Sequence, residues 1–126
     1  MGIVIGVDFD GTCVTHEYPK VGKDIGAVPV LKKLREKGHL LILHTMRFEE
    51  TERDAINWFI ANDILLYGVN RNKTQWRWSK SPKIYANLYI DDAALGCPLK
   101  TDPELSDRPF VDWEAVEKLL IEREIL

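Results

Sequence analysis

Two pairs of aspartates follow apolar runs of this sequence at points where a buried strand would end. Asp8 and Asp10 stand two residues apart in "GVDFDGTCV" (6–14), and Asp91 and Asp92 are adjacent at the end of "ANLYIDD". Carboxylates packed together raise one another's pKa, so a cluster of four needs a cation or a protonated member. Magnesium binds to oxygen ligands and is commonly held by one or two carboxylates together with a substrate phosphate. All four aspartates are therefore candidate Mg²⁺ ligands.

The residues directly after the first acid pair suit a phosphate. Gly11 and Thr12 place backbone amides at a turn, a geometry that binds oxyanions. Calcium is disfavoured as the ion because no loop of the chain has the acid spacing of an EF-hand. Together the acids and the turn indicate phosphoryl transfer.

The elements that must position these residues alternate along the chain. Buried strands are expected at 3–7, 39–45, 65–69 and 86–92, and helices at 27–38, 49–62 and 112–126, with Asp112 as the cap of the last helix. The apolar faces of the second and third helices are expected to include Ile60 and Leu119. This alternation predicts an α/β sandwich with a mostly parallel sheet, whose ligands bind beyond the carboxyl ends of the strands. Thr45, at the end of the second strand, would then join the four acids.

Length and composition limit the class of protein. A chain of 126 residues with 45% hydrophobic content predicts a single domain, 1–126, and a net charge of −3 disfavours general binding to nucleic acid or to an anionic membrane. No stretch reaches the roughly 20 apolar residues of a membrane span, and the start of the chain lacks signal-peptide features. We expect a soluble, cytoplasmic protein with no membrane partner. Cys13 and Cys97 are expected to be small buried residues.

The motifs in their order resemble the haloacid dehalogenase superfamily of aspartate-nucleophile phosphatases. "DFDGT" is followed by "HTMR", then by a lysine, then by "YIDDAALG", and the match covers the whole chain. The resemblance implies a three-layer, Rossmann-like core and an Mg²⁺-dependent phosphatase that forms an aspartyl-phosphate. Because neither the stretch after Gly11 nor the stretch between Thr45 and Lys83 has room for a full cap domain, the chain is similar to the capless branch.

The resemblance also implies roles for individual residues. Asp8 is the nucleophile, and Asp10 is the general acid that later activates water. Asp8, the backbone carbonyl of Asp10, and Asp91 or Asp92 hold the metal. Thr45 binds the phosphoryl oxygens, and Lys83 neutralises the developing charge.

Other interpretations stay open for several of these residues. Lys80 competes with Lys83 as the catalytic lysine, and Arg47 contacts either the substrate or one of Glu49 and Glu50. The histidines form no metal-ligand pattern, so surface or packing roles are expected for them. Two other classes remain: a catalytically weak module that binds phosphate or a protein, and a receiver-type phospho-acceptor. "LLYGVN" lacks the aspartate that a receiver needs after its third strand.

The segment 70–82, "NRNKTQWRWSKSP", departs most from the rest of the acidic chain, because it has four basic residues interleaved with Trp76 and Trp78. A flap over a small phosphate ester and an interface between copies of the chain are the favoured interpretations, since Trp and Arg are enriched at interfaces. Nucleic acid is the third, because single-strand binders combine cations with aromatic faces. The loop 16–24 is expected to shape the entrance of the site. Apart from the phosphorylated substrate, small or macromolecular, no partner is specified.

Overall fold

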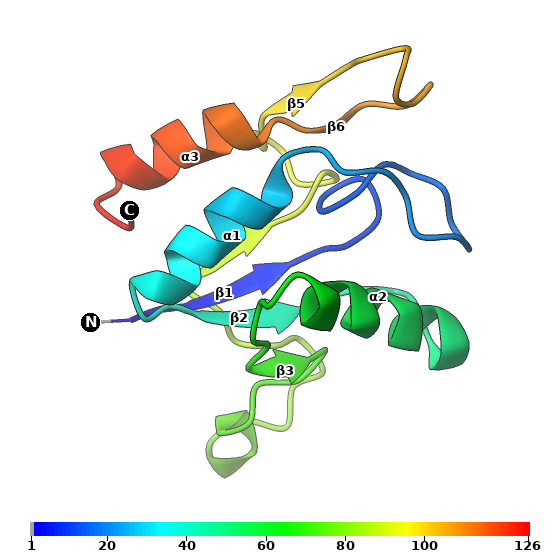
Figure 1. Cartoon of the computed structure of the whole chain (residues 1–126). Coiled ribbons are helices and arrows are strands. Elements are labelled where there is room, and N and C mark those ends of the chain that lie inside the picture. The colour runs from blue at the N-terminus through cyan, green and yellow to red at the C-terminus, as the bar shows by residue number, and fades with distance from the viewer. Residues whose placement is uncertain (1) are drawn as a thin grey trace.

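A parallel sheet of four strands lies at the centre of the computed structural model, which describes residues 2–126 (Figure 1). The strands are β1 (Val4–Val7), β2 (Leu40–Leu43), β3 (Gly68–Val69) and β4 (Leu88–Ile90), in the order β3-β2-β1-β4. Val7 is in register with Leu43 on one side and with Ile90 on the other. The strands therefore end level with one another, and the residues after β1, β2 and β4 meet at one edge.

Three α-helices follow the predicted pattern: α1 (Ala27–Glu36), α2 (Glu49–Ala61) and α3 (Trp113–Glu122). Gly38, at a φ of 87°, ends the first helix in the left-handed conformation that glycine adopts most readily. Acidic residues occupy the first turn of α2, where they complement the helix dipole. Asp112 caps α3 by accepting a hydrogen bond from the amide of Ala115, as the sequence predicts.

The two faces of the sheet are covered differently. Alternate strand residues such as Val7 and Leu43 belong to one core cluster with residues from all three α-helices. Gly6 lies on the opposite face, where an added Cβ would stand 2.9 Å from the Tyr89 ring and 3.6 Å from Ile84. The third layer is thus the segment 70–87, whose regular element is the short helix η1 (Gln75–Arg77). The predicted three-layer, Rossmann-like α/β sandwich is confirmed, and within residues 2–126 no cap domain is inserted after β1 or β2.

Some local expectations differ from the structure. Only two residues of the predicted strand 65–69 pair with β2, and a short antiparallel hairpin of β5 (Leu99–Lys100) and β6 (Phe110–Val111) is additional. Ile60 and Leu119, expected on buried helix faces, are exposed because they lie at the margins of those faces. Cys13 is buried and Cys97 is half-buried, and both are free thiols.

No helix in the described part of the chain is long and apolar enough to cross a membrane.

Candidate functional site

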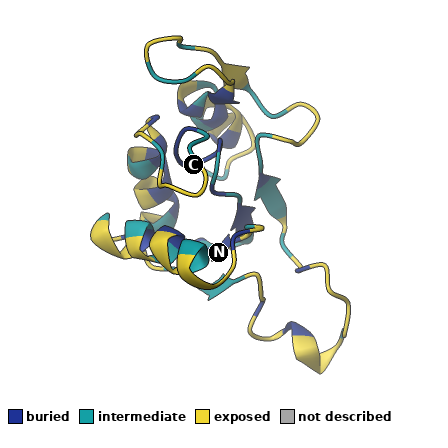
Figure 2. Ribbon diagram, turned by 90° about the vertical axis from the view of Figure 1, so that its right-hand side faces the viewer, coloured by how far each residue is buried: buried dark blue, intermediate teal, exposed yellow. Residues whose placement is uncertain are grey.

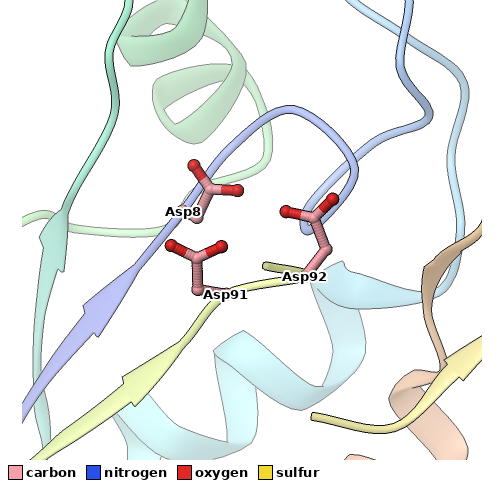
Figure 3. Close-up of side chains that lie close together, drawn as sticks. All are labelled: Asp8, Asp91 and Asp92. Atoms are coloured by element: carbon pink, nitrogen blue, oxygen red, sulfur yellow. The ribbon is translucent and has the colours of Figure 1, made fainter. Parts of the chain in front are cut away.

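Three carboxylates meet at the carboxyl edge of the sheet (Figure 3). Asp8 follows β1, Asp91 and Asp92 follow β4, and one carboxylate oxygen from each lies within 4.8 Å of the others. The backbone amide of Asp8 extends the sheet pairing by donating to the carbonyl of Ile90 at 3.0 Å. Because the adjacent, paired strands β1 and β4 carry these residues, the spacing of the three acids is fixed by the sheet. Three oxygen donors at this spacing fit a hard divalent cation such as Mg²⁺.

The turn after β1 ties the acids together. The Thr12 hydroxyl donates to Asp8 Oδ2 at 2.8 Å and accepts from the backbone amide of Asp92 at 3.0 Å. Gly11 has a φ of 79°, and a Cβ there would stand 2.0 Å from Nε2 of His16, so only glycine fits this turn. The indole of buried Trp113 donates to the Thr12 carbonyl at 2.6 Å. The turn is therefore held from both the β4 side and the α3 side.

Burial raises the pKa of Asp8 to about 8, opposed by the hydrogen bond from Thr12 and reinforced by the negative charge of Asp91 and by contact with Asp92. Without a cation, the cluster thus favours a proton on Asp8 at neutral pH. A divalent cation would compensate the same excess of negative charge, so the donor set fits magnesium in charge as well as in chemistry.

Asp10 has a different environment, although it stands only two residues from Asp8. Its carboxylate accepts two hydrogen bonds from Arg47, from Nε to Oδ2 at 2.8 Å and from Nη2 to Oδ1 at 2.7 Å. The bidentate pair is the strongest geometry for a guanidinium and a carboxylate. The Asp10 carboxylate, counted among the predicted metal ligands, is thereby directed to Arg47 and lies outside the cluster of three.

Arg47 is buried, with 3% of its surface exposed, and its other hydrogen bonds go to backbone carbonyls. Nη1 donates to Pro19 and Thr51, and Nη2 donates to Lys20. Arg47 therefore joins Asp10, the loop 16–24 and the start of α2. Of the two alternatives for Arg47, pairing with Glu49 or Glu50 is wrong, because the guanidinium is bonded to Asp10 instead.

The residues after β2 and β3 hold one another in place. Thr45 donates its backbone amide to the side-chain oxygen of Asn70 at 2.8 Å, and the Asn70 amide group donates back to the Thr45 carbonyl at 2.9 Å. The Thr45 hydroxyl accepts from the backbone amide of Arg47 at 3.1 Å. Thr45 thus lies at the predicted edge of the sheet.

An open pocket of about 840 Å³ covers this edge and unites most of the predicted site residues. Its walls include the residues Asp8, Asp10, His16, Tyr18, Thr45, Arg47, Asn70, Asp91, Asp92 and Arg108. Lys83 is absent from this lining, although its neighbours Pro82 and Ile84 contribute to it; its Nζ lies 5.6 Å from the centroid of the Tyr89 ring. Within the described residues, neither Lys83 nor Lys80 forms an ion pair with the acids.

Two further pocket residues have positions that were not predicted individually: His16, expected only in a loop at the entrance and in a surface or packing role, and Arg108, for which no role was expected. His16 Nε2 lies 2.8 Å from Asp92 Oδ2, a contact that follows from the tight turn at Gly11. Arg108 reaches the pocket from the β5–β6 hairpin, an element with no periodic signal of its own. A histidine five residues after a glycine-containing acidic turn was the available sign for the first; for the second the sequence offered none.

The comparisons with known proteins bear on the fold. A solved structure described as a conserved protein from Bacteroides thetaiotaomicron matches with a TM-score of 0.80 and 33% sequence identity, over 98% of this chain and 93% of that one. At this identity and coverage the chain belongs to the same family as that protein, whose description states no activity. No family model matches the chain, and no curated protein matches it.

Proposed function

We propose that the chain is an Mg²⁺-dependent phosphatase that hydrolyses phosphate monoesters through an aspartyl-phosphate on Asp8. The observation that carries the proposal is the group of three carboxylates within 4.8 Å of one another in an open pocket, with a fourth acid, Asp10, beside it. The order of motifs that resembles haloacid dehalogenase phosphatases supports it further.

Each residue has a chemical task in this proposal. A carboxylate oxygen of Asp8 attacks phosphorus, the bond to the leaving oxygen breaks, and Asp10 supplies the proton that this oxygen takes up. Water then attacks phosphorus and gives its proton to Asp10, which releases inorganic phosphate and restores Asp8. The Thr45 hydroxyl binds the phosphoryl oxygens, while Asp8, Asp91, Asp92 and the Asp10 carbonyl would hold Mg²⁺. The amides of Gly11 and Thr12, which the sequence suggested for the phosphate, instead donate to the carbonyls of Val14 and Phe9 within the turn. The ion, when bound, offsets the charge repulsion between carboxylate and phosphate.

In this proposal an arginine, rather than the expected Lys83, neutralises the charge of the phosphoryl group. Because Lys83 lies outside the pocket, Arg47 and Arg108 are the arginines on its wall that can neutralise the phosphoryl group. Arg47 is already committed to Asp10, so Arg108, an exposed side chain, is the better candidate for direct contact.

The test is phosphate release from a panel of small phosphate esters, with Mg²⁺ or with EDTA. We expect turnover that EDTA abolishes, that Asp8→Asn removes, and that Asp10→Asn lowers by about 10² or more. Beryllium fluoride should trap wild type and fail to trap Asp8→Asn. Turnover retained by Asp8→Asn would contradict the nucleophile assignment.

A second candidate is a phosphate-binding module with little catalytic power. Two observations favour it: hydrogen bonds from Arg47 occupy both oxygens of Asp10, and within the described residues Lys83 forms no ion pair with the acids. Acetyl phosphate distinguishes the two functions. A module would be phosphorylated once per chain or merely bind phosphate, whereas a phosphatase would release phosphate continuously.

A further inference from the structure

The segment 70–82 forms a basic hollow next to the acidic pocket. In Figure 1 it extends beyond β3, and Figure 2 shows that most of it is exposed. The hollow has a volume of about 560 Å³. It is lined by Arg71, Lys73, Lys80 and Trp76 among others. No Asp or Glu occurs between residues 64 and 90, so these cations have no acidic partner within the segment.

Two buried amide side chains give the hollow its shape. Gln75 donates to the carbonyl of Lys83 at 2.8 Å and accepts from the amide of Tyr85 at 2.7 Å. Asn72 donates to the Tyr85 carbonyl at 3.0 Å. These hydrogen bonds join the start of the segment to the backbone at residues 83–85. The basic side chains are therefore attached to a backbone that is ordered without a ligand.

Aromatic surface accompanies the cations. Trp76 is 73% exposed and Trp78 is 61% exposed, and Trp78 meets the ring of Tyr85 edge-on. The Arg77 guanidinium lies 5.9 Å from the centroid of the Trp76 ring. Exposed tryptophan faces are costly in water. Beside cations that form no ion pair within the part of the chain that the structure describes, they suit a ligand that presents flat rings and phosphates together.

The hollow borders the acidic pocket. Both are lined by Asn70, Pro82 and Ile84, so a ligand can extend from the three carboxylates past these residues to Trp76. A small phosphate ester would fill only the acidic pocket. A chain with several phosphates would fill both.

We propose that the basic hollow binds the body of a single-stranded nucleic acid whose terminal phosphate enters the acidic pocket. Arg71, Lys73 and Lys80 contact internal phosphates, and Trp76 stacks on a base. This inference rests on the proposed function for the reaction at the strand end, while binding of the strand is independent of it. A simple polyanion would use the cations but leave the tryptophans exposed, which is why a nucleic acid strand fits better.

The experiment compares one triple variant with a matched control. The hollow variant reverses the charge of the hollow with three substitutions: Arg71→Glu, Lys73→Glu and Lys80→Glu. The control variant makes the same change in net charge at exposed positions of α1, the residue after it, and α3, with Lys32→Glu, Lys37→Glu and Lys118→Glu. Each is combined with Asp8→Asn, and binding of a fluorescent oligothymidylate of about eight residues with a terminal phosphate is followed by anisotropy. Melting temperatures establish that both variants are folded.

We expect the hollow variant to weaken binding by about tenfold or more, and Trp76→Ala by about fivefold or more, while the control changes it less than twofold. Wild-type affinity should fall with salt with a logarithmic slope of about −2, as three phosphate contacts to a single strand imply. Equal binding by the hollow variant and Asp8→Asn alone would overturn the inference, and the segment would then be assigned to contact with a protein.

Turnover separates this inference from the proposed function. With Asp8 intact, the hollow variant should lose about tenfold in kcat/KM for the oligonucleotide and keep its rate on a small phosphate ester within about twofold. Loss on the small ester to the same degree would contradict a separate strand site. If wild type hydrolyses neither substrate yet binds the strand through the hollow, the phosphatase proposal fails and the binding site stands.

Discussion

Asp8 and Asp10 are two residues apart in the same turn, yet they belong to regions with opposite electrostatic character. Asp8 faces Asp91 and Asp92, forms no ion pair with a cation among residues 2–126, and has its pKa raised by burial to about 8. Asp10 faces a buried guanidinium that satisfies both of its oxygens. The first region has excess negative charge that a ligand must compensate; the second is neutral and complete within the chain. In an extended segment residues two apart would point to the same side, so the difference arises because the chain leaves the strand after Val7 and bends into the turn at Asp10 and Gly11.

The largest expected effect is the loss of stability on removing Arg47, the cation that pairs with Asp10. Arg47→Met would leave the Asp10 carboxylate and three backbone carbonyls without their donor, and we expect a loss of about 3 kcal/mol in the free energy of unfolding. Arg47→Lys should lose less, because it keeps the charge without the fork. Urea denaturation measures both, with the exposed Arg53→Met as control. A loss below about 1 kcal/mol for Arg47→Met would show that the pair does not hold the turn.

The next effect concerns the charged region and pH. In the metal-free protein Asp8 binds its proton more tightly than in the unfolded chain, so its contribution to stability is fully present below pH 4 and is lost as the pH rises toward about 8. Mg²⁺ must displace that proton. The rise in melting temperature on adding Mg²⁺ should therefore grow from pH 6 to pH 8.5.

Thermal denaturation in Mg²⁺ and in EDTA checks this expectation, and saturating Mg²⁺ at 100 times its dissociation constant should add about 2.7 kcal/mol. Asp8→Asn serves as the control, since it removes both the proton site and one ligand. A shift that is the same at every pH would contradict the raised pKa of Asp8.

The smallest expected effect is a reduction in Mg²⁺ affinity on removing His16, the histidine beside the three carboxylates. His16 holds one oxygen of Asp92, and loss of such a partner weakens metal affinity by about tenfold. His16→Ala should show this reduction in calorimetric Mg²⁺ titration. His44→Ala is the matched control, because His44 lines the same pocket but contacts the Tyr89 ring rather than an acid. If His16→Ala and His44→Ala bind Mg²⁺ with equal affinity, His16 does not support the metal site.

The contrast between the two regions also explains what the sequence could predict. Asp8, Asp91 and Asp92 follow apolar runs, and parallel strands bring their carboxyl ends to one edge, so periodicity alone placed these acids together. The partner of Asp10 was not predictable in this way, because the direction of Arg47 depends on how the loop 16–24 folds over it. The same limitation applies to Lys83, whose position follows from the hydrogen bonds of Gln75 and Asn72 rather than from any periodic pattern. Within the fold, α1 and α2 end close to their expected bounds, whereas β3 is short because only two of its residues pair with β2.

The hydrogen bond between the Trp113 indole and the Thr12 carbonyl has a spectroscopic consequence. Indole emission responds to the local electric field. The N–H group of Trp113 donates to the carbonyl of Thr12, and the hydroxyl of Thr12 donates to Asp8. Trp76 and Trp78, by contrast, are open to soluble quenchers such as iodide. With the exposed emission quenched and the half-buried Trp58 replaced by phenylalanine, the remaining fluorescence of Trp113 would report events at the acidic turn without any attached dye.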